Sequence, residues 1–164
     1  MTPSLWADGA LSAYLDRLAS SAPTPGGGSA ACVAGALGAS LGSMVVAIAS
    51  KKTPAPDWED LAHDFGTLRN DFLLLAEEDE RAFGVVMAAL RLPKAEPSRA
   101  ARLQEALEQA ADAPLRVAKR AIDLLTRLQV LAPRASDAIV SDVAAGAHLG
   151  LAALRSSLLN VDIN

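Results

Sequence analysis

The sequence predicts an all-α protein, a single-domain bundle of about five long helices around a buried central helix rich in alanine and glycine. No stretch of the 164 residues shows the sustained alternation of apolar and polar side chains that is expected of a strand. Several long stretches bounded by prolines instead repeat their apolar residues every three or four positions. Because 51% of the residues are apolar and no linker interrupts them, we expect residues 1–164 to fold around one core.

Prolines and capping patterns set the expected ends of the helices. We expect the five helices at residues 4–20, 27–52, 57–92, 97–131 and 136–160. Pro54 follows two lysines that favour the negative end of the second helix, and Pro93 and Pro97 bracket the loop after the third. Pro133 ends the fourth helix, whereas Pro114 lies inside that helix and should kink it.

The second stretch is the most apolar part of the chain. Residues 29–49 carry no charge and are long enough to raise the question of a membrane span. They are mainly alanine, glycine and serine without aromatic residues at either end, so we expect a buried helix and no membrane association. Gly35, Gly38 and Gly42 lie three and four residues apart, which opens one face to close packing. Cys32 is expected to be a small buried thiol rather than a nucleophile.

The composition argues against several classes of function. The net charge of −4 and the pI of about 5.1 disfavour a nucleic-acid-binding surface, which requires a basic face. A single cysteine and two histidines, without the spacing of zinc ligands, argue against an internal disulfide and a metal site. The N-terminal residues show no basic segment followed by an apolar one, so we expect a cytoplasmic protein without a secretory signal.

The glycine-rich segment before the second helix is a candidate ligand site. Pro25, Gly26, Gly27, Gly28 and Ser29 form a turn that runs directly into the helix. Glycines permit positive φ and close approach of a ligand, while the first backbone N–H groups and the helix dipole favour an anion. The alternative is a plain helix cap formed by Ser29 or a glycine. The segment also matches a dinucleotide-binding fingerprint loosely, but no strand precedes it.

An aspartate interrupts the apolar seam of the third helix. The seam steps by threes and fours through Leu61, Phe65, Leu68, Phe72, Leu75, Asp79, Ala82, Val86 and Ala89. A carboxylate among apolar neighbours either finds a partner or has a raised pKa, and both suit proton transfer near neutral pH. Asp79 is therefore a candidate catalytic acid or base. The alternative is a structural aspartate bonded to another helix.

The last helix carries three polar side chains in an otherwise apolar stretch. Between residues 138 and 154 these are Ser141, Asp142 and His148, and we expect the helix to be buried nearly all round. Ser141 and Asp142 belong either to a ligand site or to the helix cap. His148 is more typical of a hydrogen-bonded core or interface histidine than of an acid or base.

Five segments, taken together, resemble the ordered motifs of a known family. They read Ala-Pro-Thr-Pro-Gly-Gly-Gly-Ser at 22–29, Glu-Asp-Glu-Arg-Ala-Phe at 78–83, Arg-Leu-Pro-Lys at 91–94, Ser-Asp-Val at 141–143 and Asn-Val-Asp-Ile-Asn at 160–164. They look like the motifs of the formiminotransferase-cyclodeaminase C-terminal domain family, which includes formiminotetrahydrofolate cyclodeaminases and methenyltetrahydrofolate cyclohydrolases. The resemblance spans nearly the whole chain.

The resemblance implies an all-helical homodimer with a folate site in a cleft at the dimer interface. It implies that Asp79 transfers protons while formiminotetrahydrofolate is cyclised with release of ammonia, or while methenyltetrahydrofolate is hydrolysed. The residues implied to bind substrate are Pro25, Gly26, Gly27, Gly28, Ser29, Lys51, Lys52, Ser141 and Asp142. The tetrahydrofolate derivative is the substrate, with no metal and no separate cofactor, and a separate formiminotransferase is a candidate partner.

Two segments depart from the family pattern. The family commonly has Gly-Lys-Lys-Lys-Tyr after the second helix, where this chain reads Ser-Lys-Lys-Thr-Pro at 50–54. Ahead of Ser141 it commonly has Gly-Asn-x-Asn, where this chain reads Ala-Ser-Asp-Ala at 135–138. These departures support an alternative in which the protein is a non-catalytic folate-binding or dimerisation module of the same fold.

Overall fold

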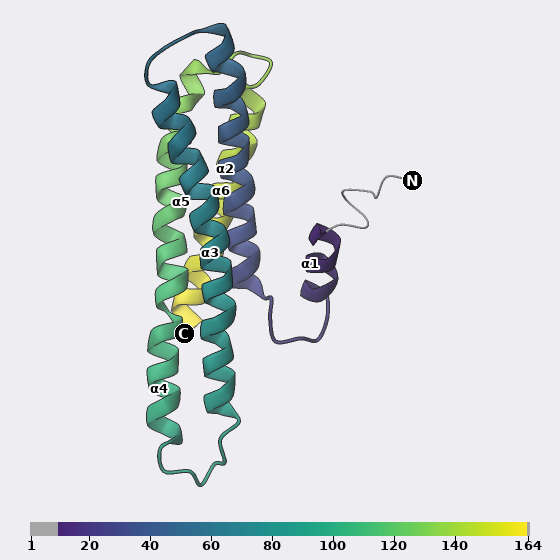
Figure 1. The fold of residues 1–164 in the computed structure, drawn as a ribbon. Helices are drawn as coiled ribbons and strands as arrows, with labels where there is room; N and C mark the ends of the chain where they lie inside the picture. The colour runs from purple at the N-terminus through teal and green to yellow at the C-terminus, as the bar shows by residue number, and fades with distance from the viewer. Residues whose placement is uncertain (1–9, 164) are drawn as a thin grey trace.

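The computed structural model describes residues 10–163, which form helices and connecting turns without a strand among them (Figure 1). The helices are α1 Ala10–Leu18, α2 Gly27–Lys52, α3 Trp58–Leu90, α4 Arg99–Ala110, α5 Asp112–Leu131 and α6 Val140–Ile163, with a 3-10 turn at Ala132–Arg134. The predicted all-α fold is confirmed. The start of the first predicted helix, and the N-terminal segment used to argue against a secretory signal, lie outside the described residues.

Helices α2, α3, α5 and α6 form the body of the molecule and run alternately up and down. Within the body, α2 packs most extensively against α3 and α6. α4 precedes α5 along nearly the same line, so α3 and α4 extend together as a hairpin beyond the body (Figure 1). α1 lies to the side, near the start of α2, and none of its residues is buried.

The core forms where the apolar seam of α3 meets the glycine face of α2. The buried seam residues of this core are Leu61, Phe65, Leu68, Phe72 and Leu75. Val86 and Ala89, further along α3, form a second and smaller buried cluster with Ala106 and Ala110 of α4, so the buried residues are not one core as expected. A Cβ atom on Gly35 would lie 2.5 Å from the Phe72 ring, and one on Gly42 would lie 2.5 Å from Cδ1 of Phe65. Full burial of such a ring contributes roughly 1.5 to 3 kcal/mol. The predicted close packing at these glycines is confirmed, and the structure shows that they accept aromatic rings.

A ladder of ion pairs closes the other side of α3 against α5. Acidic residues seven positions apart, at the N-cap of α3 and along α3, pair with arginines of α5 and the turn after it: Asp57 with Arg134, Asp64 with Arg127, Asp71 with Arg120 and Glu78 with Arg116. A seven-residue spacing keeps the same face of each helix toward its partner. At the end of the ladder, the guanidinium group of Arg134 also lies 3.5 Å from the centre of the Trp58 ring. The ladder fixes the register of the two antiparallel helices.

The fourth predicted helix is two helices. α4 ends at Ala110 and α5 begins at Asp112, so the expected kink at Pro114 is instead a break ahead of it. Pro114 is the third residue of α5, where a proline is tolerated because the first turn has no intrahelical acceptors to bond. Inside a continuous helix its ring would have met the carbonyl group of Ala110.

The last helix begins and ends later than predicted, at Val140 and Ile163. Its buried residues form a single stripe of Val143, Gly146, Gly150, Ala153 and Ser157. The expectation that this helix is buried nearly all round is wrong within one chain, since Leu158 and Leu159 are 45% and 63% exposed. The apolar residues on its other faces have too few neighbouring helices in a bundle of this size to cover them.

One described helix, α2, is long and apolar enough by length and composition to cross a membrane. Half of its most apolar window is buried inside the chain. Core helices of soluble proteins meet the same criterion. The absence of membrane association therefore stays a prediction.

Candidate active site

The glycine-rich turn and Asp79 meet in a pocket of about 210 Å3. Its lining consists of Pro23, Thr24, Gly26, Gly27, Gly28, Asp79, Phe83, Ala110, Asn160 and Ile163. These residues come from the segment before α2 and its first turn, the middle of α3, the end of α4 and the last turns of α6. Four parts of the chain that are far apart in sequence thus build one site.

Gly28 brings the first turn of α2 into direct contact with the carboxyl group of Asp79. A Cβ atom at position 28 would lie 2.5 Å from Cγ of Asp79 and would overlap both carboxyl oxygens. The backbone N–H of Ser29 donates a hydrogen bond to the same carboxyl group. Position 28 requires glycine because the carboxyl group occupies the space of a side chain.

The surroundings of Asp79 raise its pKa above the ordinary value for an aspartate. Burial is the main cause because it disfavours the charged form, and the negative charge of Glu80 adds to it, whereas the bond from Ser29 lowers the pKa. Cys32, one turn further along α2, is buried, and burial raises its pKa to about 12. The thiol stays protonated, as expected of a structural cysteine, while the carboxyl group is the titrating group of the pocket.

The turn acts through close packing rather than through an unusual backbone. No described glycine has a positive φ, so that part of the expectation is wrong. The N-cap of α2 is Gly26, which is extended at φ −133° and ψ −157°, and no side chain caps the helix. Ser29 is 1% exposed, and its hydroxyl group lies 3.3 Å from the hydroxyl group of Tyr14. Pro25 is buried and follows a cis peptide bond.

Sequence reasoning assigned no role to several pocket residues, among them Thr24, Phe83 and Asn160. The side-chain amide of Asn160 donates to the Ser156 carbonyl oxygen at 2.9 Å and faces the space beside Gly27. All three lie in segments that resemble family motifs, and this membership was the feature of the sequence that could have indicated a role in the site. Periodicity along single helices could not show that the end of α6 meets the start of α2.

The other predicted substrate-binding residues lie at the opposite end of the helix bundle from the pocket. Lys51 and Lys52 are the exposed last residues of α2, roughly 35 Å along the helix from Gly28. Ser141 and Asp142 lie within the first turn of α6, roughly 28 Å along that helix from the pocket. Within one chain the structure does not bring these four residues to Asp79.

Comparison with known proteins identifies the family. A family model described as formiminotransferase-cyclodeaminase matches residues 10–164. The chain belongs to this family. It is 40% identical over 162 residues to a methenyltetrahydrofolate cyclohydrolase of Methylorubrum extorquens, which covers 92% of this chain and 76% of that protein. It is 30% identical to a formimidoyltransferase-cyclodeaminase of Gallus gallus, which covers 94% of this chain but 30% of that protein.

A solved structure of the same family has the same fold. The formiminotetrahydrofolate cyclodeaminase of Thermotoga maritima matches with a TM-score of 0.84 and 31% identity, over 94% of this chain and 77% of that one. The resemblance read from the ordered motifs is therefore confirmed over nearly the whole chain. The fold and the family are shown, and the chain spans about a third of the length of the animal relative.

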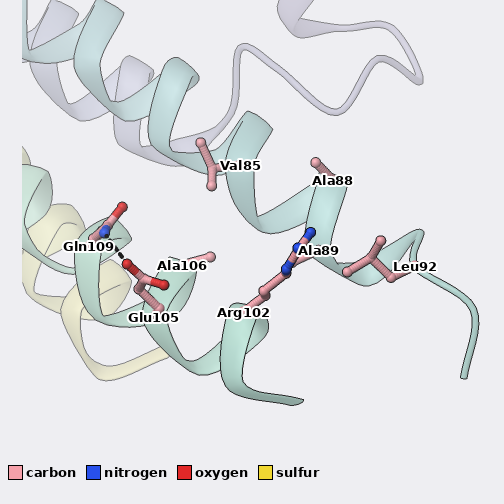
Figure 2. Close-up of a pocket in the computed structure, with 8 residues that line it drawn as sticks. All are labelled: Val85, Ala88, Ala89, Leu92, Arg102, Glu105, Ala106 and Gln109. Atoms are coloured by element: carbon pink, nitrogen blue, oxygen red, sulfur yellow. Dashed lines mark hydrogen bonds between the residues drawn. The ribbon is translucent and has the colours of Figure 1, made fainter. Parts of the chain in front are cut away.

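A larger cavity of about 330 Å3 lies between α3 and α4 (Figure 2). Val85, Ala88, Ala89, Leu92 and Ala106 give that cavity apolar walls, and Arg102, Glu105 and Gln109 add polar groups. Glu105 and Gln109 are hydrogen-bonded to each other at 3.3 Å. The larger cavity contains no residue of the glycine-rich turn and no carboxyl group against a helix start.

Neither of the two histidines lines the Asp79 pocket. His63 and His148 are both exposed, so His148 is not a core histidine within the chain. The alternative of an interface histidine is untested. Among residues 10–163 no group of three or more histidine, cysteine, aspartate or glutamate side chains is placed to hold a metal ion.

Proposed function

We propose that the protein is a folate one-carbon enzyme in which Asp79 is the catalytic acid and base, and that it hydrolyses methenyltetrahydrofolate. The observation that carries the proposal is the Asp79 carboxyl group, with its raised pKa, seated against Gly28 and the N–H of Ser29 in a pocket. The 40% identity to a methenyltetrahydrofolate cyclohydrolase, over 76% of that relative, favours this reaction within the family.

A carboxyl group of raised pKa suits both proton transfers of the hydrolysis. Water adds to the methenyl carbon while the Asp79 carboxylate accepts one of its protons, which gives a neutral hydroxyl adduct. The bond from that carbon to one folate nitrogen then breaks, Asp79 returns its proton to this nitrogen, and the hydroxyl proton passes to water. The formyl product remains, and one proton is released overall.

Cyclisation of formiminotetrahydrofolate is the second candidate reaction. The likeness to the Thermotoga maritima cyclodeaminase, with a TM-score of 0.84, favours it. In this reaction N10 of the folate attacks the formimino carbon, Asp79 accepts the proton from N10, and the same proton leaves with ammonia. Both reactions use one carboxyl group first as base and then as acid.

The glycine-rich turn is proposed to hold an anionic or carbonyl group of the folate. Gly26 and Gly27 line the pocket without side chains, so a ligand can approach the start of α2 closely. The N–H groups and the dipole of a helix start favour oxygen ligands. Pro25 and Ser29 are buried in the same turn and hold it against the bundle.

We further propose a homodimer that completes the site. On the side of α2 opposite Gly35 and Gly42, Leu37 and Met44 are 54% and 38% exposed, an apolar strip suited to a second copy. In a two-fold dimer that pairs these helices antiparallel, the far end of one α2 lies beside the pocket of the other. The substrate-binding residues that one chain leaves remote, Lys51, Lys52, Ser141 and Asp142, then belong to the neighbouring site.

The remaining parts of the proposal follow from this chemistry. The tetrahydrofolate derivative is the substrate, and neither a metal ion nor another cofactor is needed for the proton transfers. A separate formiminotransferase is the proposed partner if cyclisation is the reaction, because the animal relatives carry both activities in the name of one longer protein. We propose a cytoplasmic location and no nucleic-acid partner.

Incubation with methenyltetrahydrofolate and, separately, with formiminotetrahydrofolate tests the proposal. Loss of methenyl absorbance indicates hydrolysis, whereas its appearance together with ammonia indicates cyclisation. Asp79→Asn should abolish either reaction while circular dichroism shows an unchanged helical fold, and unchanged turnover would remove Asp79 from the mechanism. Folate binding without either product would overturn the proposal in favour of a non-catalytic folate-binding or dimerisation module.

A further inference from the structure

Within residues 10–163, α1 reaches the bundle through two polar contacts on either side of Asp79. The hydroxyl group of Tyr14 lies 3.3 Å from that of Ser29. One turn later, Arg17 pairs with Glu80 at 3.4 Å. Ser29 donates its backbone N–H to Asp79, and Glu80 is the next residue along α3. The contacts of α1 therefore fall on the two groups that act directly on the carboxyl group.

We propose that Tyr14 and Arg17 are positioning residues for proton transfer by Asp79, with α1 acting as a strap across the start of α2 and the middle of α3. This inference rests on the proposed function, because it assumes that Asp79 transfers the proton. It adds a segment that lies outside the five sequence motifs and outside the pocket lining.

Tyr14 acts through Ser29. The Ser29 side chain is almost completely buried and takes no part in capping α2, so the Tyr14 hydroxyl group is its partner. A buried hydroxyl group that loses its partner costs free energy and turns toward another one. Such a rotation moves the residue whose N–H holds the carboxyl group, which makes the Tyr14 contact a constraint on the position of Asp79.

Arg17 acts through Glu80. The negative charge of Glu80 raises the pKa of Asp79. Arg17 pairs with Glu80, and a positive charge beside that carboxylate should offset part of its effect on Asp79. The offset is modest because the Arg17 and Glu80 side chains are 60% and 26% exposed. The other elements around Asp79 add no charge: α2 contributes the protonated thiol of Cys32, and the residues of α4 and α6 in the pocket are uncharged.

The pH dependence of turnover tests Arg17, with whichever of the two folates the wild type converts. The acidic limb of kcat/KM reports the loss of a proton from the base. Arg17→Gln should move this limb to higher pH by roughly 0.3 unit, because the charge of Glu80 is then uncompensated. Arg17→Lys should restore most of the wild-type profile, and Glu80→Gln should move the limb to lower pH. In the Glu80→Gln background, Arg17→Gln should move the limb less, because Glu80 no longer holds Arg17 beside α3.

Tyr14→Phe removes the Tyr14 hydroxyl group and with it one hydrogen bond to Ser29. It should lower kcat several-fold, the size of effect that the loss of one hydrogen bond produces, and change KM less. Because no residue of α1 is buried, Arg17→Gln should leave the melting temperature of the bundle unchanged. Tyr14→Phe should lower the melting temperature only by the cost of one unsatisfied Ser29 hydroxyl group, so the variant is fully folded at the assay temperature. A fall in kcat that follows a loss of folded protein at the assay temperature would instead assign Tyr14 a purely structural role and overturn its part of the proposal.

Arg69→Gln is the matched control, since it removes one positive charge from an exposed arginine on α3 whose recorded partner is its neighbour Asn70. It should leave the pH profile unchanged. If Asp79→Asn abolishes turnover but the Arg17→Gln and wild-type pH profiles coincide, the proposed role of Arg17 in α1 is wrong and the proposed function stands. If Asp79→Asn remains active, the proposed function fails, whatever the result for Arg17.

Discussion

Two residues from different helices, Gly28 of α2 and Asp79 of α3, are in direct contact at the site. Gly28 has no side chain because the carboxyl group of Asp79 fills the position of its Cβ atom, and the next residue, Ser29, donates its N–H to the same group. The contact desolvates the carboxyl group on one side and leaves it open to the pocket on the other. Small changes at either position should therefore alter proton transfer before they alter the fold.

Gly28→Ala should lower kcat by about 100-fold, because the added methyl group displaces the Asp79 carboxyl group by an ångström or so. Gly84→Ala on α3 is the control, since a Cβ atom there meets nothing within 4 Å and Gly84 does not line the pocket, so its kcat should stay close to that of the wild type. Steady-state kinetics on both variants measures the difference. Equal losses in the two variants would contradict the steric account.

Asp79→Asn should raise the melting temperature near neutral pH. With its pKa raised above 3.8 in the folded protein, Asp79 holds its proton to higher pH than in the unfolded chain, so the free energy of unfolding falls as pH rises through that window. Asparagine does not titrate. In thermal unfolding the variant should gain stability relative to the wild type as the pH rises above 3.8, until Asp79 of the folded wild type is ionised. A stability difference that does not change with pH would contradict the raised pKa.

At the scale of helices, α3 is organised by two patterns that run side by side. Its apolar seam packs Phe65 and Phe72 into the glycine face of α2, and its acidic residues seven apart pair with arginines along α5. The ion pairs are partly exposed, so each contributes about 1 kcal/mol or less. The aromatic packing therefore contributes more to stability and sets the register of α3 against α2 that places Asp79 at the start of α2, while the ladder aligns α3 with α5.

Gly42→Ala should destabilise the protein by about 1 to 3 kcal/mol, because the new methyl group overlaps the buried Phe65 ring and that ring has no room to move. Gly66→Ala on α3 meets nothing within 4 Å and should stabilise by about 0.5 to 1 kcal/mol through helix propensity. Chemical denaturation of both variants compares the two. Destabilisation by Gly66→Ala of a similar size would contradict the packing argument.

At the scale of the whole molecule, the helices separate the predicted site residues into two groups. Asp79 and the glycine-rich turn lie at one level of the bundle, while Lys51 and Asp142 lie near its other end. A rigid helix cannot fold back to join its own ends. If both groups bind one folate, they come from two copies of the chain.

Mixing two inactive variants tests this arrangement. Asp79→Asn and Asp142→Ala should each lack activity alone, but their hybrid dimer has one site with both residues intact, so an equimolar mixture after subunit exchange should recover about a quarter of wild-type activity. Mass spectrometry verifies that hybrids form. Hybrids without activity, or a single sedimenting monomer at micromolar concentration, would contradict the shared site. Full activity of Asp142→Ala alone would remove Asp142 from substrate binding.

Local patterns predicted much of the fold and part of the site. The α3 seam was readable because periodicity within one helix reports its buried face, and the glycines of α2 predicted close packing. The break before Pro114 was missed because a proline in a long helical stretch is compatible with either a kink or a new first turn. Asn160 was missed because nothing along α6 indicates which helix end it will face.

The sequence alone determined the helical class, the family and the presence of a carboxyl group on an apolar seam, because each depends on local composition and residue order. The tertiary structure decided that this carboxyl group replaces the Cβ atom of Gly28, that its pKa is raised, and that α1 reaches its two neighbours. It also separated Lys51 and Ser141 from the pocket. These outcomes depend on register and distance between helices, which no pattern along a single helix contains.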